Sequence, residues 1–205
     1  RNTYTLLSMT LAFSALTCGL SMAMNLGYGA AMIMNIAAIA LVWFVLPRTA
    51  NSATGIYVVF AFTGLLGASL GPTINHYMAS ANGGQIVLQA LGGTAITFLG
   101  LSGYVLTTRK DFSFMRGFLV IGLIVAVVGM LALFVAGMFG VNISGMHLAL
   151  SGLIVLLMSG FILYDTSRII HGGETNYVMA TVSLYLNIYN LFVALLHITG
   201  AMSDD

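Results

Sequence analysis

Charged residues are scarce in this chain, whose 205 residues include six Lys or Arg and five Asp or Glu. Six basic side chains are too few to form a surface for DNA or RNA, so the composition argues against a nucleic-acid partner. So little charge also excludes a water-soluble domain, because the surface of such a domain has to be solvated. Cys18 is the single cysteine, which excludes an internal disulfide and a metal site built from several cysteines.

Apolar residues fill the chain instead. Hydrophobic residues make up 60% of it, and the mean hydropathy is +1.04. A helix crosses the bilayer core with roughly 20 residues, and the apolar runs are too long and alternate too little to be strands. We therefore predict an all-α membrane protein that forms a single domain over residues 1–205 in the lipid bilayer. The seven predicted transmembrane helices cover residues 6–24, 28–46, 56–79, 85–107, 118–139, 146–164 and 179–200.

Residues typical of turns separate these spans. Asn and Gly recur at residues 25–27, 82–84, 141–142 and 172–173, and Pro47 is expected to end the second span because proline cannot continue a helix. Within the third span, Pro72 follows glycines spaced three and four residues apart. We expect a kink or a tight helix crossing there, since glycine allows close approach of two helices.

The basic residues fall on one side of the membrane when the spans are drawn this way. The N-terminus and the connections after the second, fourth and sixth spans carry all of them, and the other connections carry none. The positive-inside rule then places the N-terminus in the cytoplasm, and seven crossings place Asp204 and Asp205 in the periplasm. The six basic residues are Arg1, Arg48, Arg109, Lys110, Arg116 and Arg168.

Polar residues recur along one side of the seventh span. Ser183, Asn187, Asn190, Ala194 and His197 are spaced by four, three, four and three residues, so they share one helix face. Polar groups are costly in hydrocarbon, so this face is expected to meet protein or water. One interpretation is hydrogen bonding between helices, and the other is the lining of a hydrated path.

Asp165 is the acidic residue closest to the interior of a span. If the chain turns near Asn176, Asp165 precedes the turn by eleven residues and Asn187 follows it by eleven, so both lie at a similar depth. A carboxylate and an amide would then face each other. The alternative is a local ion pair with Arg168, three residues further along the helix. The candidate residues of a gate or ion path are Asp165, Asn187, Asn190, Ser183, Arg48 and Arg168.

Catalytic and metal-binding motifs are missing from the sequence. It has no His-Glu-x-x-His, no Gly-x-Ser-x-Gly and no paired aspartates within a span. His76, His147 and His197 are scattered and do not have the spacing of a metal site. We therefore predict a protein that is not an enzyme and that has no catalytic residues, no metal site and no cofactor.

Four segments resemble the transmembrane Bax-inhibitor-motif family, also called the Bax-inhibitor-one family. They are FTG to Gly71-Pro72 from residue 62, QALGGTA at 89–95, TRKDFSF at 108–114 and SLYLNIYNLF at 183–192. The resemblance extends over essentially the whole chain. The segment IIHGGETNY at 169–177 resembles the proteobacterial inner-membrane branch in particular.

The resemblance implies a seven-helix fold in which the last helix is central and the other six wrap it. It implies an inner-membrane protein that modulates the membrane-anchored AAA protease, or is its slow substrate, in membrane-protein quality control, beside prohibitin-like holder proteins. Because the chain begins at Arg1, we expect a cytosolic segment ahead of it for the protease to grip. The form that begins at Arg1 is then expected to be degraded slowly or not at all.

The family also implies an alternative function, a pH-sensitive calcium leak gated by two facing aspartates and an arginine. Asp165 matches the first aspartate, but Asn187 stands at the second position. Two close carboxylates repel each other, and they therefore tend to share one proton. An Asp–Asn pair lacks this effect, and it is also a poor calcium site. We therefore expect a regulatory protein, with a leak of calcium or protons as the alternative.

Overall fold

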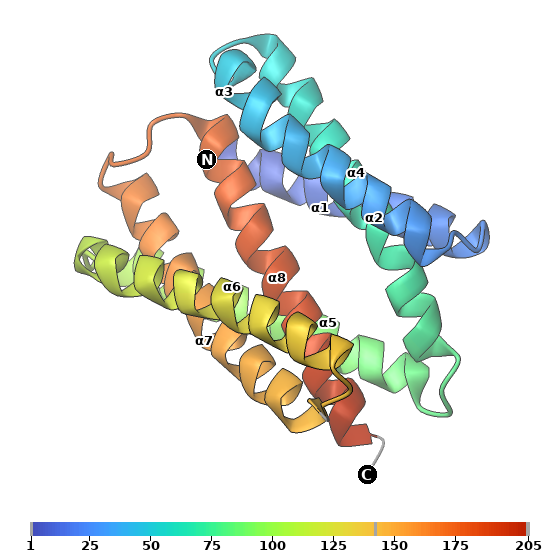
Figure 1. The fold of residues 1–205 in the computed structure, drawn as a ribbon. Helices are drawn as coiled ribbons and strands as arrows, with labels where there is room; N and C mark the ends of the chain where they lie inside the picture. Colours follow the sequence, from blue (N-terminus) through green and yellow to red (C-terminus); the bar gives the residue numbers. More distant parts are fainter. Residues whose placement is uncertain (1, 142, 204–205) are drawn as a thin grey trace. The chain divides into compact units, whose positions relative to one another are not determined.

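A computed structural model of the chain describes residues 2–141 and 143–203 (Figure 1). The predictions for Arg1, Asp204 and Asp205, and for the turn at Asn142, lie outside these residues. The chain divides into two compact units, which are described separately below. Unit 1 comprises Arg1–Gly84 and Glu174–Tyr185, and unit 2 comprises Gln85–Gly173 and Leu186–Asp205.

Helices form every regular element of the described residues, and seven stretches are long and apolar enough to cross a membrane. The predicted class and number of spans are therefore confirmed, whereas the wrapping of the last helix by the other six stays a prediction. The elements are α1 Asn2–Ala23, α2 Tyr28–Ala40, a π-helical turn Leu41–Val45, α3 Leu46–Thr49, α4 Ala53–Met78, α5 Gly83–Thr108, a 3₁₀ turn Ser113–Met115, α6 Arg116–Met138, α7 Ser144–Ile170 and α8 Tyr177–Ser203.

Unit 1 is organised by a close contact of α1 with α4. A β-carbon at Gly67 of α4 would collide with the backbone oxygen and hydroxyl of Ser14, and one at Gly71 would collide with the side chain of Ser21. The expected tight crossing at these glycines is thus present, because α4 offers no side chain where α1 approaches it.

Enlarging Gly67 is expected to separate α1 from α4. We expect Gly67→Ala to reduce the free energy of unfolding by about 1–3 kcal/mol, the usual cost of overpacking. Gly19→Ala is the matched control because Gly19 lies on α1 with open space around it. Thermal unfolding in detergent would measure both variants. Equal midpoints for the two would contradict the close contact.

Pro47 does not end the second span, so this prediction is wrong. The helix continues through α3 to Thr49 after the π-helical turn Leu41–Val45, in which the N–H of Leu46 bonds to the oxygen of Leu41. A proline ring clashes with the carbonyl four residues before it. The wider π turn relieves this clash, which is why the span reaches a full 22 residues.

The first turns of α8 complete unit 1. The hydroxyl of Tyr185 lies 2.5 Å from the hydroxyl of Ser14 on α1 and donates to the oxygen of Thr63 on α4 at 3.3 Å. Thr181 donates to the oxygen of Thr3 at 3.3 Å. Both buried hydroxyls therefore hold α8 against the two packed helices.

Unit 2 is built around an interlocked pair, α6 and α7. Leu119 of α6 would meet a β-carbon at Gly160 of α7, and Leu157 of α7 would meet one at Gly122 of α6, so each leucine lies over a glycine. Large apolar side chains elsewhere on α6 are exposed, as expected for a helix that faces lipid. The buried core is formed by Leu119, Ala126, Leu157, Met158, Ile162, Tyr164 and Leu191.

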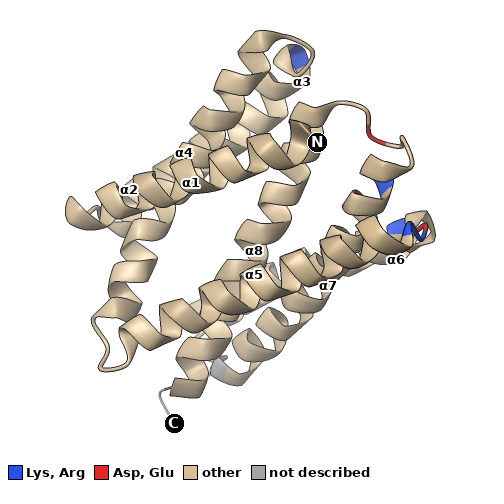
Figure 2. Ribbon diagram, turned by 180° about the vertical axis from the view of Figure 1, so that it is seen from behind, with Lys and Arg blue, Asp and Glu red and all other residues tan. Residues whose placement is uncertain are grey.

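Charge is confined to one end of each unit among the described residues (Figure 2). In unit 2 the blue and red segments lie where α5 ends, α6 begins and α7 ends, and the turn from α6 to α7 at the other end has neither colour. In unit 1, Arg48 lies in α3, and Glu174 precedes α8 and accepts from the N–H of Asn176, whose side chain bonds to Ala50. This distribution fits the charge rule from which the orientation was predicted, and the orientation itself stays a prediction.

Candidate functional site

The last turns of α7 carry four consecutive polar residues inside unit 2. Asp165, Thr166 and Ser167 are buried, with exposed fractions of 8%, 0% and 1%. Polar groups at this depth require hydrogen-bond partners. Successive residues of a helix point in different directions, so each of these side chains reaches a different partner.

Asp165 bonds to α8. The amide nitrogen Nδ2 of Asn187 donates to its carboxylate oxygen Oδ2 at 2.7 Å, and the exposed fraction of Asn187 is 7%. The equal-depth argument predicted this pairing, which the structure confirms. A short bond from an amide to a carboxylate is stronger than a bond between neutral groups, so it holds α7 against α8.

Thr166 bonds to α5. Its hydroxyl lies 3.2 Å from the hydroxyl of Ser102, and both side chains are buried. This contact fixes the end of α5 at the same level of α7. The polar run therefore connects α7 to two neighbouring helices at once.

Ser167 bonds to the loop between α5 and α6. Its hydroxyl accepts from the backbone N–H of Phe112 at 3.0 Å, and it lies 3.4 Å from both the oxygen of Lys110 and Oδ1 of Asp111. His171 contacts the same loop, since its Nε2 lies 3.1 Å from the oxygen of Arg109. The sequence did not single out Ser167 or His171. Polar residues at these positions look like the ordinary end of a helix.

Asp111 starts the next helix. Its Oδ1 accepts from the backbone N–H of Ser113 at 2.8 Å. That bond holds the pKa of Asp111 below its usual value, and the charge of His171 acts in the same direction. The Asp-x-Ser spacing within TRKDFSF is the sequence signal from which this turn could have been found.

Arg168 interacts with its own connection. Its Nη2 donates to the oxygen of Gly173 at 3.0 Å, and its guanidinium carbon lies 5.6 Å from the ring centroid of Tyr164. These contacts fix the arginine at the end of α7. The local ion pair of Arg168 with Asp165 stays an open alternative to the gate.

Within unit 2, the remaining gate candidates are not grouped with the Asp165–Asn187 pair. Asn190 is exposed, and its Nδ2 donates to the oxygen of Leu186 on its own helix. Ser183, which is half-buried, and Arg48 belong to unit 1. The residues on the polar face of α8 therefore lie in different surroundings. The role of this face as an ion path stays a prediction.

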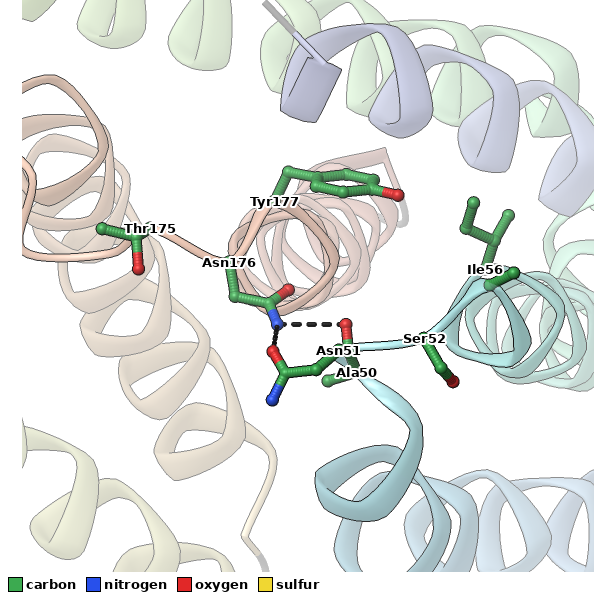
Figure 3. A pocket seen from close by; sticks show the side chains of 8 residues that line it. Ala50, Asn51, Ser52, Ile56, Thr175, Asn176 and Tyr177 are labelled. Carbon is green, nitrogen blue, oxygen red and sulfur yellow. Dashed lines mark hydrogen bonds between the residues drawn. The ribbon is translucent and has the colours of Figure 1, made fainter.

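A hollow of about 480 Å³ lies in unit 1 at its charged end (Figure 3). Figure 3 shows Asn176 between the α3–α4 connection and the start of α8. Its Nδ2 donates to the oxygen of Ala50 at 3.0 Å and to Oδ1 of Asn51 at 2.7 Å. Its Oδ1 accepts from the N–H groups of Val178 and Met179, so the same side chain caps α8. The sequence predicts Asn176 only as a turn residue.

Among the described residues, no three or more His, Cys, Asp or Glu side chains lie together in a way that could hold a metal ion. Asp165 and Asn187 offer one carboxylate and one amide oxygen, which is fewer oxygen ligands than calcium takes. What the site supplies is a set of hydrogen bonds that join α5, α7, α8 and a loop.

Known proteins resemble this chain along its whole length. The profile of the family described as "Inhibitor of apoptosis-promoting Bax1" matches residues 1–204. The chain is 50% identical over 205 residues to the "Modulator of FtsH protease YccA" of Escherichia coli K12, and the same identity holds for the "Inner membrane protein YccA" of Escherichia coli O6:H1. It is 49% identical over 206 residues to an "Uncharacterized membrane protein" of Vibrio cholerae. Each comparison covers 100% of this chain and 90% of the relative.

Proposed function

The chain belongs to the family of inhibitors of apoptosis-promoting Bax1, and from this premise we propose that it is an inner-membrane protein that modulates the FtsH protease. The relative named for that activity matches this chain along its whole length. The family description and that name both denote an inhibitor or modulator rather than a catalyst. We accordingly assign the chain a regulatory role and no chemical reaction.

The hydrogen bonding of the buried polar groups is the observation that supports a regulatory protein rather than an ion channel. Asp165, Ser167 and Asn187 each bond to another segment of unit 2. Among the described residues, the hydroxyl of Ser21 is the buried side-chain atom with no partner. Side chains that are bonded in this way join helices. In a hydrated path the same side chains would instead bond to water or ions.

Modulation by a membrane protein has two physical routes. The chain can occupy the protease as a slowly degraded substrate, or it can contact the protease and its prohibitin-like holder proteins within the bilayer. Either route places it in the quality control of membrane proteins. We propose the first route where a cytosolic tail is present, because a protease of this type needs an unfolded end to grip.

Protease activity in the presence of the chain tests the proposal. With the chain added to liposomes that hold the purified protease, we expect a membrane substrate to be degraded several-fold more slowly, and we expect the chain to copurify with the protease. A water-soluble substrate that needs no membrane contact is the matched control. Unchanged degradation of the membrane substrate, with no copurification, would disprove the modulation.

The orientation is a further expectation of this proposal. By the positive-inside rule we expect Arg48, Arg109 and Arg168 in the cytoplasm and the C-terminus in the periplasm. Alkaline phosphatase fused after Asp205 is expected to be active, and a green fluorescent protein fused there to be dark. The reverse result, a glowing fusion with an inactive phosphatase, would invert the topology.

The leak of calcium or protons is the second candidate. The position of Asp165 against Asn187 is the observation that keeps it testable, because one substitution produces two facing carboxylates. No carboxylate–carboxylate pair is present at this contact in the natural chain, so we rank the leak below the regulator.

A further inference from the structure

The connection from α5 to α6 concentrates positive charge at one end of unit 2 (Figure 2). Arg109, Lys110 and Arg116 lie within eight residues of one another, and Asp111 is the acidic residue among them. The carboxylate of Asp111 accepts from the backbone N–H of Ser113 at 2.8 Å. Three cations and one anion leave the connection with a net charge of +2, and the anion is bonded within the connection.

The guanidinium groups of Arg109 and Arg116 are open to a ligand. Both side chains are exposed, and neither guanidinium has a hydrogen-bond or ion-pair partner among the described residues. Lys110 differs, since its Nζ lies 5.5 Å from the ring centroid of Tyr104. A guanidinium presents its N–H donors in a planar fork that matches the oxygens of a phosphate. The two arginines therefore offer unused donors to an anionic group.

Bonds to the end of α7 hold the connection in one conformation. The N–H of Phe112 donates to the hydroxyl of Ser167 at 3.0 Å. The backbone oxygen of Arg109 lies 3.1 Å from Nε2 of His171, and the φ of Arg109 is 51°, a left-handed conformation that is uncommon for a residue other than glycine. Because this backbone is ordered in advance, a ligand of the arginines does not have to overcome the entropy of ordering it.

Aromatic rings accompany the charges. The ring centroid of Phe112 lies 6.3 Å from that of Tyr104 and 6.3 Å from that of Phe114, so the three rings form a row along the connection. Phe114 is 79% exposed. Aromatic rings next to cations suit the boundary between lipid headgroups and acyl chains, where a ring contacts the chains and a cation contacts the headgroups. The row therefore favours a lipid as the ligand.

Arg116 lies at the start of an apolar strip on α6. Val120, Ile124 and Val127 follow it at spacings of four, four and three residues, so they share its side of the helix. All three side chains are exposed. A ligand of Arg116 that carries an acyl chain can lay this chain along the strip. A phospholipid has both a phosphate and acyl chains, whereas an acidic protein from the aqueous phase has no chain to cover the strip.

We propose that the α5–α6 connection binds an anionic phospholipid, with its phosphate held by Arg109 and Arg116 and an acyl chain along the apolar strip of α6. A zwitterionic headgroup carries a cation of its own, which the net positive charge of the connection repels. An anionic headgroup is attracted by the same charge. A lipid bound in this way would anchor this end of unit 2 at the membrane surface.

Native mass spectrometry of the full chain in detergent tests the site. The two probes are phosphatidylglycerol, which is anionic, and phosphatidylcholine of the same chain length, which is zwitterionic. Each basic residue near an anionic lipid surface contributes about fivefold to binding. For two free arginines we therefore expect phosphatidylglycerol to bind about 25-fold more tightly than phosphatidylcholine. Equal binding of the two lipids by the parent chain would overturn the proposal.

A soluble phosphate distinguishes the two sources of this ligand chemistry. Glycerol 3-phosphate has the phosphate but no acyl chain, so it should not displace phosphatidylglycerol at about ten times the lipid concentration. Displacement at that concentration would show a site for dissolved phosphate compounds, and the assignment to a lipid would be wrong.

Charge variants locate the site. The double variant Arg109→Gln/Arg116→Gln should lose most of the preference for phosphatidylglycerol and keep the parent's affinity for phosphatidylcholine. Arg48→Gln is the matched control, because it removes an exposed arginine of unit 1 and should keep the preference. An equal loss in Arg48→Gln would mean that the lipid responds to total charge rather than to this site. If the double variant failed to fold, each single variant should still lose about fivefold.

A protein ligand is the remaining outcome. If the parent chain bound both lipids equally, and if the double variant alone lost copurification with the protease, the connection would be a docking surface for protein. The lipid proposal would then be refuted.

Discussion

Replacing Asn187 by Asp is expected to produce an ion flux that rises between pH 6 and pH 8. The substitution places two carboxylates where an amide now donates to Asp165 at 2.7 Å. At the lower pH the two groups share a proton and remain bonded. At the higher pH both are ionised, and their repulsion is about 4 kcal/mol at 4 Å with an effective dielectric constant of about 20. That repulsion pushes α7 and α8 apart at this level.

Calcium flux into liposomes measures this effect. Since about 1.4 kcal/mol changes an equilibrium tenfold, we expect the flux of Asn187→Asp at pH 8 to exceed that of the parent by tenfold or more. Asp165→Asn should abolish any flux that the parent shows. Asn190→Asp is the matched control, because it adds the same charge three residues later on α8 at an exposed position. If parent, Asn187→Asp and Asp165→Asn all gave the same flux, the gate would be refuted and the bond would be structural.

Removing the side chain of Asn176 is expected to be the most destabilising polar substitution in unit 1. Asn176→Ala loses the cap of α8, which is worth about 0.5–2 kcal/mol, and the bonds to Ala50 and Asn51. A net value of about 1 kcal/mol for each of the two lost bonds brings the expected decrease in unfolding free energy to about 2.5–4 kcal/mol. Unfolding in detergent as a function of temperature measures it.

Asn176→Asp distinguishes the two roles of this side chain. Aspartate keeps an oxygen for the N–H groups of Val178 and Met179, and its charge suits the start of a helix. It has no N–H to give to Ala50 or Asn51, so α8 should stay capped while the link to the α3–α4 connection is lost. Thr175→Ala, an exposed neighbour in the same hollow, is the control. Full stability in both Asn176 variants would show that neither role matters.

The spans were predictable because bilayer thickness sets a length that the apolar runs match. The bond between Asp165 and Asn187 was predictable for a related reason. In two antiparallel helices joined by one turn, residues equally far from the turn lie at equal depth. The end of α7 was not. The polar run 165–168 suggested an end near Tyr164, but α7 continues to Ile170 because Asp165, Thr166 and Ser167 each find a partner on another segment.

Two other features were not predictable from the sequence. Pro47 breaks an ordinary helix, and only the three-dimensional arrangement shows that a π turn accommodates its ring. The role of Asn176 depends on Ala50 and Asn51, which lie far from it in the sequence. No local pattern records such distant partners, whereas local rules such as span length and turn composition were sufficient for the outline of the fold.

The division of unit 1 between the two ends of the chain has a consequence for its synthesis. Thr181 and Tyr185 of α8, which bond to residues of α1, leave the ribosome long after α1 and α4. Until then the hydroxyl of Ser14 and the backbone oxygen of Thr3 lack their partners from α8. Helix α1 is therefore inserted before these bonds can form, and unit 1 becomes complete only when α8 has been made.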